Sequence, residues 1–167
     1  MIRQEEPADI VAIYRINQAA FGQTAEANLV DKLRQGGKLS LSLVAEIDGQ
    51  LVGHIAFSPV TLETNPSASA VVGLAPMAVL PAYQRSGIGS ALVREGLARG
   101  RAAGFDAVIV LGHPEYYPRF GFVPASRFGL HSEYGVPDEV FMALELRPGA
   151  LSGCSGLAQY QAEFNEV

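Results

Sequence analysis

The sequence predicts one mixed α/β domain, with a central, mostly antiparallel sheet flanked by helices. Apolar segments of strand length alternate with segments of helical periodicity between Ile2 and Leu146. An Asp48-Gly49 pair between two apolar segments is typical of a tight antiparallel hairpin. A strand, a helix and a strand then follow one another over residues 70–111, which predicts a parallel crossover. The sheet is therefore expected to be mixed, with strands 70–79 and 107–111 as its parallel pair.

Length and composition indicate a compact chain. At 167 residues it has the size of one ordinary domain, so we assign residues 1–167 to a single domain. Its core is expected at about 2–146, and a tail at 147–167 is expected to pack on that core. Nearly half of the residues are hydrophobic and only 17% are charged, which excludes a disordered chain.

Charge and cysteine content exclude several classes of protein. A formal net charge of −5 argues against a nucleic-acid surface, which needs clustered Lys and Arg. It is compatible with cationic substrates, although a modest net charge mostly reports solubility. No apolar run approaches the roughly 20 residues of a membrane span, and residues 1–6 lack a signal peptide. Cys154 is the only cysteine, and the three histidines lack metal-ligand spacing, so we expect no disulfide, no metal site and a cytoplasmic protein.

Caps and turns delimit the elements of the first half. Thr24 is a good N-cap, and glycines at 22, 36 and 37 are typical helix ends. In order, we expect a strand at 2–5, a helix from Asp9 to about Gly22, a helix from Thr24 to Gly36-Gly37, hairpin strands at 40–47 and 51–61, and a turn at 65–67.

The second half begins with the long apolar strand 70–79. The helix after its glycine loop carries Gly96 and Gly100 on its apolar face, and each costs about 1 kcal/mol of helix propensity relative to Ala. Close packing on the sheet is the expected compensation. Beyond Gly104 we expect a strand at 107–111, a short helical segment at 115–120, a last strand at 140–146, and aromatic anchors in the tail at Tyr160 and Phe164.

The loop between strand 70–79 and its helix predicts an anion site. Residues 85–90 read Arg-Ser-Gly-Ile-Gly-Ser, so several backbone N–H groups turn toward one point at the positive end of a helix. A dinucleotide fingerprint is excluded because Leu92 stands where its third glycine belongs. A P-loop is excluded because its Lys-Ser/Thr pair is absent.

Two motifs in this order resemble those of the GNAT superfamily of acetyl-CoA-dependent N-acetyltransferases. The first, Gln84-x-x-Gly87-x-Gly89, resembles the superfamily's pyrophosphate signature Q/R-x-x-G-x-G/A. The second, residues 117–122, resembles its Y-x-x-x-G-F pattern, with Tyr117 as the tyrosine. The resemblance covers about residues 2–146 and implies a GNAT-like acyl-CoA N-acyltransferase fold with acetyl-CoA as cosubstrate.

The resemblance also implies roles for particular residues. Met77 and Val79 would use their backbone groups to pair with the pantetheine arm, and Met77 N–H would face the thioester oxygen. Tyr117 would protonate the departing CoA thiolate. The residues expected to bind the cosubstrate are Met77, Ala78, Val79, Gln84, Arg85, Ser86, Gly87, Ile88, Gly89, Ser90 and His113.

His113 stands where many members of the superfamily carry an asparagine. It is open whether His113 contacts the cosubstrate, acts on the substrate or caps the following turn. The reaction also needs a base, because an ammonium must lose a proton before it attacks. Glu26 is our first candidate, followed by Glu46, His54 and Glu115.

The sequence therefore predicts direct transfer of an acetyl group to a primary amine. The acceptor stays open between a small molecule and a protein amine, and the polar segment 128–139 is expected to border its site. Edge strands or the tail are compatible with a homodimer. One alternative is a non-catalytic acyl-CoA-binding or regulatory module with the same fold, and another is a structural protein whose glycine loop only makes a turn.

Overall fold

A computed structural model describes residues 1–64 and 70–167, so the turn expected at 65–67 lies outside the described residues. The chain forms two compact units. Unit 1 comprises residues 1–58, 75–98 and 162–167, and unit 2 comprises residues 59–74 and 99–161. Strand β5 (Val71–Val79) contributes to both units. The single-domain organisation stays a prediction of the sequence.

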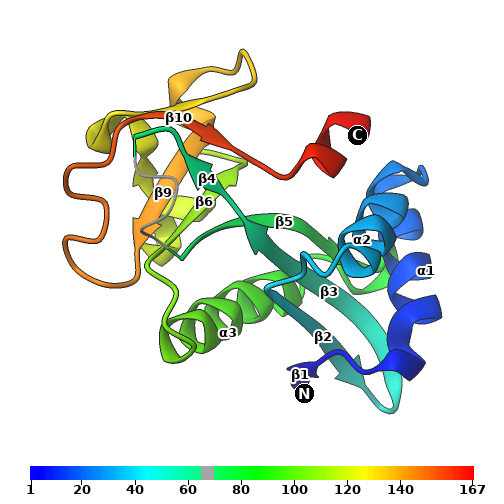
Figure 1. Ribbon diagram of the computed structural model, residues 1–167. Helices are drawn as coiled ribbons and strands as arrows, with labels where there is room; N and C mark the ends of the chain where they lie inside the picture. Colours follow the sequence, from blue (N-terminus) through cyan, green and yellow to red (C-terminus); the bar gives the residue numbers. More distant parts are fainter. Residues whose placement is uncertain (65–69) are drawn as a thin grey trace. The chain divides into compact units, whose positions relative to one another are not determined.

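Unit 1 contains the antiparallel part of the sheet that the N-terminal half was expected to form. Its strands are β1 (Ile2–Gln4), β2 (Leu41–Ile47), β3 (Gln50–Pro59) and the carboxyl half of β5, in the order β1-β2-β3-β5 (Figure 1). Asp48 and Gly49 join β2 to β3 with φ angles of 50° and 78°, which are the positive values that a type I′ turn requires. The predicted hairpin is confirmed.

The helices of unit 1 are α1 (Ile10–Phe21), α2 (Ala25–Gln35) and the first part of α3 (Ile88–Ala102). Ile13 of α1 and Val30 of α2 cluster with Val44 on one face of the sheet. Gly53 and Phe57 on β3 point to the opposite face, against α3. A Cβ atom at Gly96 would lie 2.6 Å from the Phe57 ring, so the predicted close packing of Gly96 is confirmed.

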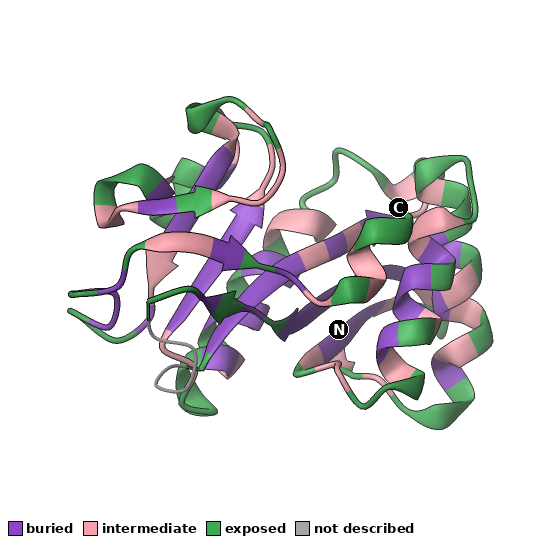
Figure 2. Cartoon of the chain, turned by 45° about the horizontal axis from the view of Figure 1, so that its top comes forward, coloured by how far each residue is buried: buried purple, intermediate pink, exposed green. Residues whose placement is uncertain are grey.

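Helix ends follow the sequence closely. Gly22 ends α1 in the left-handed region at φ 69°, and Gly36 follows the last residue of α2. Thr24 is the N-cap residue of α2 as expected, but its side chain makes no capping hydrogen bond. The central strands are buried along most of their length, whereas the outward turns of α1 and α2 are exposed (Figure 2).

Unit 2 contains the parallel pair. Its main sheet runs β5-β6-β9-β7, with β6 (Ala107–Leu111), β9 (Phe141–Glu145) and β7 (Val123–Pro124). Residues 71–73 of β5 pair in parallel with residues 107–109 of β6, and every other described pairing of the main sheet is antiparallel. The predicted fold class is confirmed.

A second sheet, also in unit 2, was not predicted. It consists of β4 (Thr61–Leu62), β10 (Gly156–Gln159) and β8 (Leu130–Ser132) in that order. The expected strand over 51–61 is therefore divided into β3 and β4. The strand expected at 140–146 is present as β9, but it is not the last one, because β10 follows it. The strands of the second sheet have two to four residues, too few for an alternating pattern, and their partners are distant in sequence.

Short 3-10 helices join the remaining elements. They are η1 (Pro7–Asp9), η2 (Pro81–Tyr83), η3 (Tyr117–Phe120), η4 (Ala125–Phe128), η5 (Asp138–Val140) and η6 (Ala162–Glu166). Tyr160 of the tail is buried, as an aromatic anchor should be. None of the described helices is long and apolar enough to cross a membrane.

Candidate functional site

The loop between β5 and α3 has the backbone conformation that an anion site needs. Arg85 and Gly87 both have positive φ angles, of 63° and 89°, which fold residues 84–87 tightly in front of the helix. A Cβ atom added at Gly87 would meet nothing within 4 Å, so space outside this residue is open. The side chains of residues 84–86 are exposed.

Local hydrogen bonds hold this loop to the end of β5. The Gln84 side-chain amide donates to the Val79 carbonyl oxygen at 2.9 Å, and Tyr83 N–H donates to Leu80 O at 2.8 Å. The Ser86 hydroxyl donates to Tyr83 O. Gln84 and Ser86 were expected to hold pyrophosphate, and in the structure their side chains shape the loop.

The first amides of α3 supply the positive charge. The Ala91 N–H donates to Gly87 O at 3.0 Å, which closes the first turn. The N–H groups of Ile88 and Gly89 precede this bond, so they have no acceptor one turn earlier in the helix. The first turn carries no acidic residue. This arrangement favours a bound anion.

The carboxyl end of strand β5 presents the backbone groups of Met77 and Val79 on one edge. Leu80 N–H donates to Val52 O of β3 at 2.9 Å, so the even-numbered residues face β3 at this end, whereas at the start of the strand Val71 O accepts from Val60 N–H at 2.9 Å. Because the groups of successive residues alternate along a strand, the N–H and C=O groups of Met77 and Val79 face the other edge. Both residues lie beyond Gly73, where the described ladder with β6 ends.

Tyr117 lies in an aromatic cluster of unit 2. Its ring is 5.1 Å from that of Tyr116 and 5.6 Å from that of Phe122, both edge to face. A Cβ atom at Gly112 would lie 2.2 Å from the Tyr117 ring, so only glycine fits there. Burial, with a smaller contribution from Tyr116, raises the pKa of Tyr117 to about 12, so its hydroxyl keeps its proton at neutral pH.

His113 serves the same cluster through its backbone. Its carbonyl oxygen accepts hydrogen bonds from Tyr116 N–H at 3.1 Å and from Tyr117 N–H at 3.3 Å. Its side chain is exposed. Of the three roles left open by the sequence, this geometry supports the capping of the turn.

The candidate bases occupy different environments. Glu26 lies in the first turn of α2, is partly buried and accepts hydrogen bonds from the Gln23 amide at 3.0 and 3.1 Å. Glu46 forms an ion pair with Arg3 at 3.4 Å, so its carboxylate already has a partner of opposite charge. Glu115 is exposed and His54 is completely buried.

His54 belongs to a polar chain inside unit 1. The Asn17 amide nitrogen donates to Ile13 O at 3.0 Å and lies 3.2 Å from His54 Nδ1, which makes Nδ1 the acceptor. The other ring nitrogen, Nε2, then donates to Ser42 Oγ at 2.8 Å, and the Ser42 hydroxyl donates to Glu5. Burial lowers the pKa of His54 to about 4, so the ring is neutral at pH 7 and a weak base.

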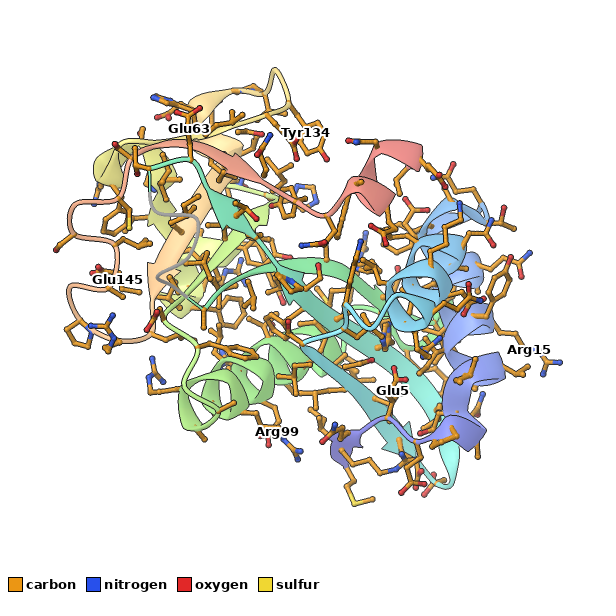
Figure 3. All side chains as sticks on the ribbon, viewed as in Figure 1. Glu5, Arg15, Glu63, Arg99, Tyr134 and Glu145 are labelled. Atoms are coloured by element: carbon orange, nitrogen blue, oxygen red, sulfur yellow. The ribbon has the colours of Figure 1, made fainter. Side chains whose placement is uncertain are left out.

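Glu5, labelled in Figure 3, ends this chain, and its side chain is only 14% exposed. Its carboxylate pairs with Arg34, at 2.8 and 3.0 Å. Burial opposes ionisation of Glu5, but the hydrogen bonds from Arg34 and Ser42 lower its pKa overall. No group of three or more His, Cys, Asp or Glu residues in the described ranges could hold a metal ion.

Gly53 is a positioning residue that the sequence analysis did not identify. A Cβ atom there would lie 3.0 Å from the Leu92 side chain and 3.1 Å from that of Ile88, so its absence lets the start of α3 lie close to β3. A glycine inside a strand is a recognised sign of such an approach, and it was available in the sequence.

Comparisons with known proteins agree with both motifs. Residues 1–125 match the sequence profile of the family described as Acetyltransferase (GNAT) domain. The chain is 39% identical over 166 residues to the uncharacterized N-acetyltransferase YhbS of Escherichia coli K12, covering 99% of this chain and 98% of YhbS. The crystal structure of Escherichia coli YhbS in complex with CoA has a TM-score of 0.94, covering 99% of this chain and 91% of that one. The crystal structure of a GNAT family acetyltransferase from Brucella melitensis in complex with acetyl-CoA has a TM-score of 0.82 at 40% identity. The match covers 98% of this chain and 97% of that one.

The buried His54 predicts a pH-dependent loss of stability. Its folded pKa of about 4 lies below the ordinary value of 6.5, so on acidification the unfolded chain takes up the proton first. The contribution of neutral His54 to the free energy of unfolding is complete above pH 6.5 and is lost as the pH falls toward 4. The loss amounts to about 1.4 kcal/mol per pH unit and about 3 kcal/mol in all.

Urea unfolding of wild type and His54→Gln between pH 7 and 4.5 should show that the free energy of unfolding of the variant depends less steeply on pH. The exposed His131→Gln variant retains His54 and should follow the wild type, and equal slopes for wild type and His54→Gln would contradict the argument.

Proposed function

The chain belongs to the GNAT family of acetyltransferases, and from this premise we propose that it transfers the acetyl group of acetyl-CoA directly to a primary amine. The loop at residues 84–90 is the observation that carries the proposal. It combines positive φ angles at Arg85 and Gly87 with the amide end of a 15-residue helix. Two relatives of 39% and 40% identity hold CoA or acetyl-CoA in their crystal structures.

Within this function, the pyrophosphate of acetyl-CoA binds at the N–H groups of the loop and of the first turn of α3. An anion is favoured there because the amides and the helix dipole both present positive charge. The pantetheine arm pairs with the backbone of Met77 and Val79, whose groups face away from β3. Gln84 keeps the loop fixed to Val79, so the site is formed before the cosubstrate arrives.

Tyr117 donates its proton toward the sulfur of the departing CoA. Its raised pKa keeps the hydroxyl protonated at neutral pH, but it also exceeds the roughly 8.5 of an ordinary thiol. Complete proton transfer is therefore uphill in the free protein. The hydroxyl acts first as a hydrogen-bond donor that stabilises the thiolate as the C–S bond breaks.

Glu26 takes the proton that the acceptor ammonium must lose. It is a partly buried carboxylate in the first turn of α2, without an ion pair among the residues described. The cytoplasmic location and the homodimer stay predictions of the sequence.

The glycine loop can be tested by binding alone. Gly87→Val places a β-branched residue at φ 89° and a side chain in the open space of the proposed phosphate site, so acetyl-CoA affinity should fall at least tenfold in calorimetric titration. Gly37→Val is the matched control, because Gly37 has φ 68° and equally open surroundings at the end of α2. Equal affinities in wild type and Gly87→Val would reject the loop as the phosphate site. No binding by the wild type would reject the proposed function.

Tyr117→Phe separates catalysis from binding. Removal of the hydroxyl should lower kcat by roughly 100-fold, with acetyl-CoA affinity kept within about twofold. CoA thiol release can be followed with a panel of primary amines, and Tyr116→Phe provides the neighbouring control. An unchanged kcat would remove Tyr117 from the mechanism. Acetyl-CoA binding without turnover of any amine by the wild type would favour the non-catalytic module.

Glu26→Gln tests the proposed base through pH. The variant should lose roughly 100-fold in kcat/KM at pH 7, and the loss should shrink toward pH 10 because the free amine then needs no base. Glu115→Gln should behave like the wild type. A loss confined to Glu115→Gln would transfer the role to that residue, and a pH-independent loss in Glu26→Gln would indicate a structural role.

A further inference from the structure

Two tyrosines and a carboxylate meet where β8 and β10 end in unit 2. The strands are parallel, with Ala158 opposite Ser132, so the residues that follow them leave the sheet at the same end. Glu133 and Tyr134 follow β8, and Tyr160 follows β10. The rings of Tyr134 and Tyr160 are stacked, with centroids 6.1 Å apart and planes at 23°. Tyr134 is labelled in Figure 3.

Tyr160 is the buried member of this cluster and packs firmly on the sheet. It is only 8% exposed, and a Cβ atom at Gly73 would lie 2.4 Å from its ring, so the ring lies directly on the backbone of β5. Its backbone N–H donates to Glu133 Oε1 at 3.0 Å. A main-chain donor therefore orients the Glu133 carboxylate and occupies only one of its several lone-pair positions.

The cluster is electrostatically incomplete. Among the described residues, Glu133 forms no ion pair with Lys, Arg or His, although it is partly buried. The Tyr134 hydroxyl oxygen is buried and forms no hydrogen bond of normal geometry in the described ranges. The Glu133 carboxylate is nevertheless close enough to add to burial in raising the pKa of Tyr134. A buried polar atom without a well-formed hydrogen bond is destabilising, and in native proteins a water molecule or a ligand usually supplies the partner.

The position of the cluster connects it with the reaction. Tyr160 is close enough to Tyr117 for the two phenols to interact electrostatically, and both belong to unit 2. Burial is the main reason that the pKa of Tyr160 is raised, with Tyr134, Glu133 and Tyr117 adding to it. The open carboxylate thus lies on the side of the unit that carries the proposed proton donor.

We propose that Glu133 and the Tyr134 hydroxyl bind a positively charged group of the amine acceptor, with the stacked Tyr134 and Tyr160 rings as an apolar wall. This inference rests on the proposed function and adds the substrate class to it. An ammonium offers three donors, which suit a carboxylate oxygen and a phenol oxygen together. An anionic acceptor would be repelled by Glu133, and a neutral one would leave the carboxylate unpaired.

The test compares two small probes of similar shape and different charge. Phenethylammonium carries the cation, and phenethyl alcohol has a hydroxyl in its place. Ligand-observed NMR titration should show the wild type binding the ammonium at least tenfold more tightly than the alcohol. Glu133→Gln keeps an acceptor for Tyr160 N–H but removes the charge, so this preference should disappear. Tyr134→Phe should weaken ammonium binding by about threefold or more.

The control is Glu139→Gln, which makes the same change of net charge at an exposed position six residues along the chain. It should keep the wild-type preference. Equal binding of the two probes by the wild type, or an unchanged preference in Glu133→Gln, would overturn the inference, and unchanged ammonium binding in Tyr134→Phe would remove the phenol from it.

Acetyl-CoA titration of the same samples separates this inference from the proposed function. Glu133→Gln should bind acetyl-CoA within about twofold of the wild type, because Glu133 lies outside the phosphate loop. If acetyl-CoA binds and the probes are not distinguished, the inference alone fails. If acetyl-CoA does not bind but the charge preference is present, the proposed function fails and the cation site stands.

Discussion

Helix α3 lies so close to strand β3 that an added side chain would clash at one position along their contact and would be crowded at another. A Cβ atom would come within 3.0 Å of Leu92 at Gly53, and within 2.6 Å of Phe57 at Gly96. This close contact fixes where α3 begins, because a helix held at both points cannot slide along the strand. The amide end of α3 is therefore held beside the end of β5, and the Gln84–Val79 hydrogen bond fastens the intervening loop. A site whose ligand is held by backbone groups depends on backbone placement, and these contacts provide it.

The opposite face of the same sheet is held together differently. A chain of hydrogen bonds runs from Asn17 through His54 and Ser42 to Glu5, where Arg34 supplies the counter-charge. Breaking one member would leave a buried polar partner unpaired, at a cost of about 1–3 kcal/mol. The chain therefore favours one arrangement of α1 on the sheet. It does so with a neutral histidine, which makes this face sensitive to acid.

Features that a few adjacent residues specify could be predicted from the sequence, whereas features that depend on contacts between distant residues could not. The Asp48-Gly49 turn, the end of α1 at Gly22 and the glycine loop are each specified by a few adjacent residues, and each was predicted. The β4-β10-β8 sheet was missed because its strands are short and pair residues near 62, 131 and 158. The Glu133 contact with Tyr160 spans 27 residues and has no local signature. Gln84 shows a third case, since the motif predicts that it binds pyrophosphate, whereas its side chain donates a hydrogen bond to Val79 O and holds the loop.

The proposed sites for the two substrates differ in the same way. The proposed acetyl-CoA site consists of local sequence motifs, whereas the proposed acceptor site consists of long-range contacts that no short sequence pattern encodes. A carboxylate beside an ammonium stabilises the charged form and so raises the pKa of that amine. Each unit of that increase adds about 1.4 kcal/mol to the cost of deprotonating the amine before attack. Binding the reacting nitrogen at Glu133 would therefore oppose the reaction that Glu133 is meant to assist. The conflict disappears if the cation at Glu133 is a second basic group of the acceptor, which makes molecules with two amines the substrates that best fit both requirements.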